Sequence, residues 1–173
     1  VSVLMIDSAT LDRLLTWRLA HQDLLLALQQ SGADVEWLER LLENPLFAKV
    51  PPANVQNMLA RLQKIELAAG SQIIEEGATG DCCYFLESGR AEGIRGAGSD
   101  HQVLAELEVG ACFGEEALLA DRPRNATVTM VEAGSVLRLD RQDFFALLKA
   151  PVVAEVSLGE GARLLTQGAQ WLD

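Results

Sequence analysis

The 173-residue chain is acidic, with a net charge of −11 and a pI near 4.6, so we expect neither nucleic acid nor an anionic membrane as a partner. Hydrophobic residues make up 49% and charged residues 23%, which is ordinary for a globular protein with a sizeable core. Three cysteines give no disulfide framework, and no apolar run is long enough for a membrane span or a signal peptide, which favours a cytoplasmic protein.

Residues 1–44 are expected to hold a strand followed by a helical segment. The letters SVLMID at 2–7 resemble SVLRLD at 135–140, and leucines follow both runs. One interpretation makes the first residues the tail of a preceding copy of one domain; the other is chance likeness between two common strand–Asp–helix segments. Leucines at helical spacing over 10–30, and apolar residues on one side of 35–43, predict two helices.

Residues 45–150 are expected to form the main domain. Pro51 and Pro52 open a predicted helix that runs to about Gln63. From residue 65 onward, short apolar runs are separated by glycines every eight to twelve residues, which argues for a β-sandwich or barrel. Residues 132–135 read as a turn into the last strand, after which Asp140 is expected to cap a helix through residue 149.

Two neighbouring cysteines, Cys82 and Cys83, lie within one of these predicted strands. Because adjacent strand residues face opposite sides, we expect one thiol to be buried and the other not. The two histidines and three cysteines show no zinc-ligand spacing, so no metal is expected.

The stretch from Phe113 to Leu119 and the run that starts at Pro123 carry the strongest chemical signal. Gly114 permits a sharp turn, and a helix starting at about Glu115 would present unpaired N–H groups that suit an anion. Arg124 adds a planar donor fork that fits phosphate oxygens. Glu115 would repel a phosphate but suits a sugar hydroxyl, so these residues together predict a nucleotide site.

The run FGEEALLADRPRNATV resembles, without gaps, the phosphate-binding cassette of the cyclic nucleotide-binding domain family. The resemblance implies an α+β, mainly β fold: an eight-stranded jelly-roll barrel with flanking N- and C-terminal helices. It implies a regulatory module with a cyclic nucleotide, cAMP or cGMP, as ligand, no other cofactor and no catalytic residue. The chain begins in a strand-like run and ends without a tail, so we expect a fragment of a larger, bacterial-type multidomain protein.

The resemblance also assigns roles to individual residues. Glu115 would accept the ribose 2′-hydroxyl, and Arg124 would pair with an exocyclic phosphate oxygen. The remaining implied ligand-binding positions are backbone donors and one apolar support: Phe113, Gly114, Glu116, Ala117, Asn125 and Ala126. The family often carries alanine after this arginine in cAMP binders and threonine in cGMP binders; Asn125 leaves the base open, with cAMP favoured.

Alternatives remain for the ligand, for the ends of the chain and for assembly. The family's fold could serve as an interaction scaffold that binds no nucleotide. Residues 151–173 read as a linker or as the start of a further domain, and their last five letters resemble the opening of a sulfurtransferase domain. The long helix that often supplies a lid is not evident after Leu148. Covalently attached domains are expected partners, and a homodimer stays open.

Overall fold

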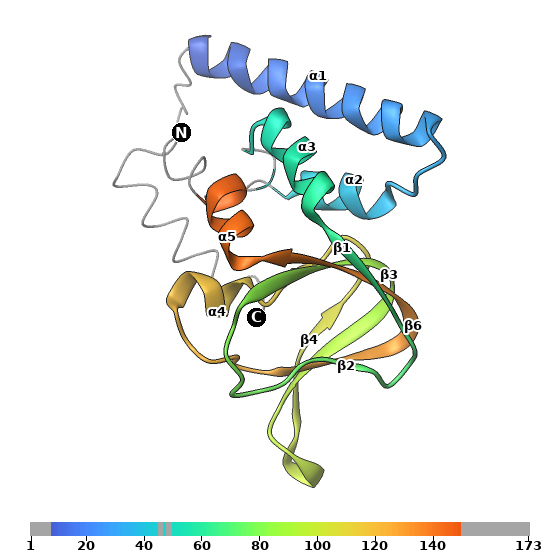
Figure 1. Cartoon of the computed structure of the whole chain (residues 1–173), viewed down its shortest axis with the longest axis vertical. Coiled ribbons are helices and arrows are strands. Elements are labelled where there is room, and N and C mark those ends of the chain that lie inside the picture. Colours follow the sequence, from blue (N-terminus) through green and yellow to red (C-terminus); the bar gives the residue numbers. More distant parts are fainter. Residues whose placement is uncertain (1–7, 45–46, 48–49, 150–173) are drawn as a thin grey trace, which may run out of the picture.

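The computed structural model describes residues 8–44, residue 47 and residues 50–149. The expected strand near the N-terminus and the segment 151–173 lie outside these residues. Helices surround one end of a curved antiparallel sheet (Figure 1). Their bounds are α1 (Ser8–Gln30), α2 (Glu36–Glu43), α3 (Pro52–Arg61) and α5 (Arg141–Phe144), which continues as the π-helical turn η3 (Phe145–Lys149).

The helices that precede the sheet start and stop where the sequence predicts. Gly32 adopts a φ of +83° just after α1, and the N–H of Ala33 returns to the carbonyl of Leu28, which closes the helix. Pro52 occupies the first position of α3, where a missing N–H is harmless. The buried face of α2 consists of Trp37, Leu38 and Leu41, and that of α3 of Val55 and Met58.

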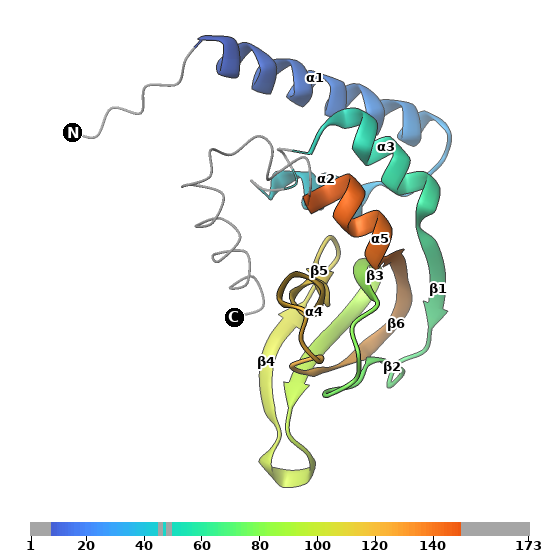
Figure 2. The same ribbon diagram turned by 60° about the vertical axis from the view of Figure 1, so that its left-hand side comes forward.

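The sheet has the strand order β1-β6-β3-β4, with β2 paired to β6 and β5 paired to β3, and all pairs are antiparallel. The β3–β4 hairpin projects from the end opposite the helices (Figure 2). It turns through η2 (Gly98–Asp100). The strands are β1 (Gln63–Leu67), β2 (Gln72–Ile74), β3 (Cys82–Arg95), β4 (Gln102–Leu107), β5 (Cys112–Phe113) and β6 (Thr127–Asp140).

A mainly antiparallel β fold with flanking helices is confirmed, but the described part of the chain has six strands, in a sheet that does not close, rather than an eight-stranded barrel. The glycine-separated pattern places a turn at Gly89, and residues 132–135 read as another, whereas β3 and β6 each run on through these points as 14-residue strands. Their pairing shifts register around Ser88 and Arg90, so the extra residues form bulges that bend the strands. Gly89 has a φ of +84°, and a Cβ on Gly134 would collide with the carbonyl of Ser88. Glycine here allows two bent strands to cross closely, which the sequence pattern does not distinguish from a turn.

Two groups of buried apolar side chains stabilise the fold. The first joins the helices to the sheet around Phe85, whose ring centroid lies 6.1 Å from those of both Trp37 and Phe47. The second fills the concave side of the sheet and contains Phe113, which stacks on Tyr84 with centroids 5.6 Å apart. α4 (Glu115–Ala120) joins the two groups, because its Leu118 belongs to the first and only Gly114 separates it from Phe113 of the second.

Two local expectations are wrong. Cys82 and Cys83 are both buried, because one lies in the helix-facing core and the other lies beneath the Arg124 guanidinium. Asp140 directly precedes α5, but its carboxylate makes no capping bond and pairs with Arg138 instead.

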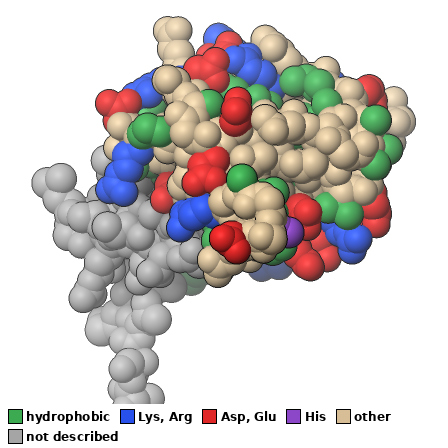
Figure 3. Space-filling model, turned by 90° about the horizontal axis from the view of Figure 1, so that it is seen from below, with side chains coloured by type: hydrophobic (Ala, Val, Ile, Leu, Met, Phe, Trp, Pro, Cys, Tyr) green, Lys and Arg blue, Asp and Glu red, His purple; other side chains and the backbone are tan. Residues whose placement is uncertain are grey.

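The exposed surface carries both signs of charge. Acidic and basic side chains are interspersed on the face seen from the hairpin end (Figure 3). Within residues 8–44 and 50–149, no helix combines the length and the apolar character needed to cross a bilayer.

Candidate functional site: a pocket beneath helix α4

A cavity of about 80 Å³ lies between the concave side of the sheet and α4. Its apolar wall comes from four strands and their borders, and its polar wall comes from α4, the loop that follows it and the end of β3. The apolar lining includes Ile74, Leu104, Leu107, Phe113 and Val128, and the polar lining includes Arg95, Glu116, Arg124 and Asn125. A pocket that is largely apolar with a few convergent polar groups is typical of a small-molecule site.

Gly114 forms the turn between β5 and α4 at the edge of this cavity. Its φ of +81° lies in the left-handed region that favours glycine. An added Cβ would lie 2.7 Å from Nη1 of Arg124 and 3.0 Å from Cδ1 of Ile74. The turn therefore requires glycine both for its backbone conformation and for the close approach of the arginine.

Arg124 is 6% exposed and is fixed at both its backbone and its guanidinium. Its N–H donates to the carbonyl of Ala78 at 2.8 Å; Nη1 donates to the Gly114 carbonyl at 2.5 Å and Nη2 to the Cys82 carbonyl at 2.6 Å. The carboxylate of Asp81 lies 4.0 Å from Nη2. A guanidinium has five N–H donors and these contacts use only some of them, so Arg124 keeps donors for an anion in the pocket.

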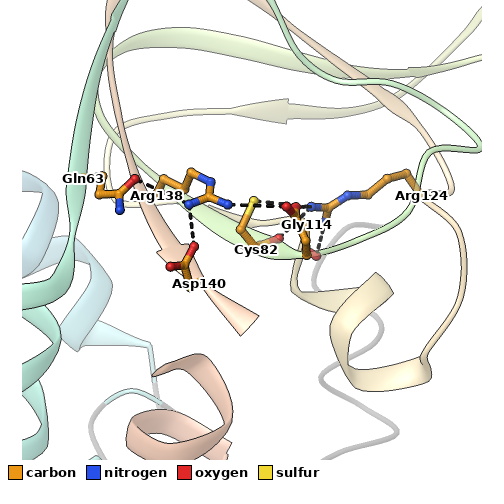
Figure 4. A network of polar contacts seen from close by, with 7 residues as sticks. Gln63, Cys82, Gly114, Arg124, Arg138 and Asp140 are labelled. Atoms are coloured by element: carbon orange, nitrogen blue, oxygen red, sulfur yellow. Dashed lines mark hydrogen bonds and ion pairs between the residues drawn. The ribbon is translucent and has the colours of Figure 1, made fainter. Parts of the chain in front are cut away.

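Cys82 lies between Arg124 and a second arginine, Arg138 on β6 (Figure 4). The carboxylate of Asp81 joins the two guanidinium groups, because its Oδ2 lies 3.4 Å from Nη2 of Arg138 and its Oδ1 lies 4.0 Å from Nη2 of Arg124. Arg138 also binds Asp140 and Gln63. Burial raises the pKa of the Cys82 thiol. A hydrogen bond from Cys82, followed by the nearby charges of Arg138 and Arg124, lowers the pKa of Asp81 despite a smaller opposing effect of burial. Positive charge thus gathers behind the α4 turn.

Glu115 is 2% exposed, although it is the first residue of a surface helix. Burial raises the pKa of its carboxyl from the ordinary 4.5 to about 7, and the charge of Glu116 adds to the rise; a backbone hydrogen bond, Arg124 and Cys112 oppose it. The Cys112 thiol lies 3.9 Å from Oε2. Unlike its neighbours Gly114 and Glu116, Glu115 does not line the cavity.

Glu116 presents its carboxylate to the cavity and holds Asn125. The side-chain amide of Asn125 donates to Oε2 of Glu116 at 2.6 Å. Nε of Arg95, at the end of β3, donates to the Asn125 carbonyl at 3.1 Å. The loop after α4 is thereby tied both to the helix and to the sheet.

Of the eight residues assigned from the sequence, the structure places seven around one cavity: Phe113, Gly114, Glu116, Ala117, Arg124, Asn125 and Ala126. Glu115 lies behind them. Sequence reasoning missed Arg95 and Cys82, since they are the two ends of β3, which reaches the site only through sheet pairing. It also missed that Glu116 and Asn125 bind each other; their closeness depends on the path of the connecting loop.

The family with the description "Cyclic nucleotide-binding domain" matches residues 64–150, which include all these positions. A cAMP-dependent protein kinase regulatory subunit from Aspergillus fumigatus is 41% identical over 109 residues, covering 62% of this chain and 26% of that protein. A cyclic AMP receptor protein from Thermus thermophilus is 33% identical over 132 residues, covering 75% of this chain and 61% of that protein. The chain therefore spans only about a quarter of the first relative and three fifths of the second.

A solved structure shows the same arrangement of elements. The regulatory domain of Toxoplasma gondii PKA, co-crystallised with cAMP, superposes with a TM-score of 0.62 at 32% identity. The match covers 69% of this chain and 46% of that one.

Proposed function

The chain belongs to the cyclic nucleotide-binding domain family, and we propose that it is a regulatory module that binds cyclic AMP in the pocket beneath α4. One observation carries this proposal: a buried arginine, Arg124, lines a largely apolar cavity and has N–H donors that its two carbonyl contacts do not use. A buried cation with no carboxylate closer than 4.0 Å is stabilised further by an anion of matching geometry. The phosphate of a cyclic nucleotide carries a single negative charge and fits this need.

In the proposal, Arg124 binds an exocyclic phosphate oxygen, and the backbone N–H groups around Gly114, Glu116 and Ala117 complete the cradle, with a further donor at Asn125 or Ala126. The two carbonyl contacts that hold the guanidinium fix its direction before a ligand arrives. Such preorganisation reduces the entropy lost on binding.

Glu115 is the proposed acceptor for the ribose 2′-hydroxyl. Its backbone lies between Gly114 and Glu116, which both line the cavity, so a change of side-chain rotamer would bring the carboxylate to the sugar. A pKa of about 7 means that the carboxyl exchanges its proton near neutral pH, and a donated hydroxyl favours the ionised form.

The base is proposed to be adenine. At the position next to the phosphate arginine, one N–H of the Asn125 side-chain amide donates to Glu116 at 2.6 Å, which holds this side chain to α4 and leaves fewer of its groups to contact a guanine. The named relatives also support this choice, because two of them are described as cAMP proteins and the Toxoplasma domain was crystallised with cAMP.

Ligand binding is proposed to signal through the helices. Leu118 of α4 belongs to the same buried cluster as Phe144 and Leu148, which follow the last strand. A displacement of α4 would therefore change the packing of α5 and η3, the last described elements before any attached domain. A ligand shifts such an equilibrium only by its difference in affinity for the two arrangements.

The test is calorimetric titration of the chain with cAMP, cGMP and linear 5′-AMP. We expect the order cAMP, then cGMP, then 5′-AMP. Arg124→Ala is expected to lose about 2–5 kcal/mol of affinity for cAMP, the range for truncating one side of a desolvated charge pair. Arg122→Ala is the matched control, because Arg122 lies in the same loop but is exposed, and its affinity should equal that of the wild type.

The rival function, an interaction scaffold without nucleotide, predicts no heat and no thermal stabilisation with any of the three ligands. Selective binding to the folded state would raise the melting temperature as the ligand concentration increases. If Arg124→Ala and Arg122→Ala lose the same amount of affinity for cAMP, the protein binds the nucleotide but the role assigned to Arg124 is wrong.

A further inference from the structure

Helix α1 is apolar on two opposite faces. Its inner face carries His21, which is buried, and Leu24, Leu25 and Leu28, which pack on the core. Its outer face carries Leu15, Leu19 and Leu26, which are 50%, 61% and 55% exposed. A helix that packs one face on a core normally presents a polar face to solvent, so a leucine stripe on the other side calls for a partner.

The stripe has the spacing of a two-stranded coiled coil. Leu15, Leu19, Gln22 and Leu26 follow one another at intervals of four, three and four residues, the alternation that keeps one seam facing a second helix. Gln22 is the one polar member of the stripe, and it also borders the cavity between α1 and α2.

We propose that the outer face of α1 packs against α1 of a second copy of this chain, with the two helices parallel. The charges on either side of the leucine stripe favour a second, parallel copy of α1 as its partner. Arg18 and Asp23 flank the seam on opposite sides and are five residues apart, so a parallel pair places Arg18 beside Asp23 of the partner subunit, twice by symmetry.

Within the described part of the chain, neither Arg18 nor Asp23 forms an ion pair, and both are exposed. An antiparallel pair would place the two charges on opposite sides of the seam, where they could not meet. The positions of Arg18 and Asp23 therefore make the face complementary to itself and also favour the parallel orientation of the two helices.

The position of α1 allows this packing. The helix runs along the edge of the molecule farthest from the sheet, with its outer face turned away from α2 and α3 (Figures 1 and 2). The pocket beneath α4 lies on the other side of these helices. Pairing through α1 would leave the pocket open, so the inference does not depend on the proposed ligand.

The seam spans about 18 Å of helix, from Leu15 to Leu26, so the contact is small and the dimer is expected to be of about micromolar affinity or weaker. Sedimentation velocity over a wide range of protein concentration measures it. Leu19→Glu is expected to raise the dissociation constant at least about tenfold, since it places a carboxylate in the centre of the seam.

Val103→Glu is the matched control for Leu19→Glu. Val103 is 47% exposed on β4, far from α1 along the fold, and its variant should dimerise like the wild type. A wild type that stays monomeric throughout the range overturns the proposal, and so does a dimer that Leu19→Glu leaves unchanged.

A charge exchange tests the partner and the direction together. Arg18→Asp and Asp23→Arg should each weaken the dimer by placing like charges opposite each other, and the double variant should recover most of the loss. Recovery is not expected if the charges act only within one helix.

Oxidative cross-linking separates the two directions independently. In a parallel pair, Leu26→Cys faces itself across the two-fold axis and should form a disulfide-linked dimer under a copper–phenanthroline oxidant, whereas the wild type should not. Cross-linking seen only when Leu26→Cys is mixed with Leu15→Cys would show an antiparallel pair and overturn the proposed direction.

Discussion

Glu115 gives a stability prediction that comes directly from its burial. The folded protein raises the pKa of its carboxyl from 4.5 to about 7, with burial as the largest cause. One pKa unit corresponds to about 1.4 kcal/mol, so the ionised form is about 3 kcal/mol less favourable in the folded than in the unfolded state. Between these two pH values the folded state binds more protons, and stability must therefore fall as the pH rises through them.

Glu115→Gln removes this penalty because the amide has about the shape of the protonated acid and does not ionise. The variant is expected to be more stable than the wild type by about 3 kcal/mol at pH 8 but by only about 1 kcal/mol at pH 5. Urea unfolding followed by tryptophan fluorescence at both pH values measures the two differences, since Trp37 lies in the core.

Because the variant and the wild type are compared at the same pH, the contributions of all other titrating groups to the free energy of unfolding cancel. Glu106→Gln is the control, because it removes one carboxylate at an exposed position of β4 and should differ from the wild type by the same amount at both pH values. If Glu115→Gln and the wild type differ by the same amount at pH 5 and pH 8, the carboxyl is already ionised at pH 5 and the assigned burial effect is wrong.

Three further changes test other parts of the structure. Gly114→Ala places a Cβ on a backbone with a φ of +81° and against the Arg124 guanidinium, and should lower the free energy of unfolding in urea by about 1–3 kcal/mol. Gly32→Ala is the control: its φ is +83° but the space around it is open, so it measures the cost of the backbone conformation without the clash. Burial lowers the pKa of His21, so the contribution of this residue to stability should fall as the pH drops below 6.5; the free energy of unfolding of the wild type minus that of His21→Gln should therefore decrease from pH 7 to pH 5, because the difference cancels the opposite effect of Glu115. Phe85→Ala empties the centre of the helix-facing core and should cost about 3–5 kcal/mol by the same method, which a loss below 1 kcal/mol would contradict.

The sequence was informative wherever a local signal decided the structure. Gly114 was expected at a turn, and it adopts the left-handed conformation that only glycine takes readily. The leucine spacing of α1 and the proline start of α3 predicted both helices within two residues of their observed bounds. Backbone preference fixes these features without reference to distant parts of the chain.

Features set by distant contacts were not predictable in the same way. Gly89 and Gly134 lie in sequence patterns typical of turns, yet in the structure they lie where two long strands bend and cross. Only the pairing of β3 with β6 distinguishes a turn from such a crossing. Cys82 is buried because Arg124 covers it, although 42 residues separate them. Such burial depends on a side chain from another part of the chain and leaves no local periodicity.

Glu115 joins these two kinds of evidence. The residues around it in the sequence identify a phosphate-binding cassette. Packing alone gives no reason for a carboxyl at a position that is 2% exposed, because a neutral side chain of similar shape would make the folded state more stable by about 3 kcal/mol at neutral pH. A buried acid that is half-ionised near pH 7 can accept a hydrogen bond from a hydroxyl brought by a ligand, and it gains a favourable partner only when that ligand is present. The instability of the empty site and the proposed binding of a sugar hydroxyl are therefore two consequences of the same buried carboxylate, as expected where function and stability make opposite demands on one residue.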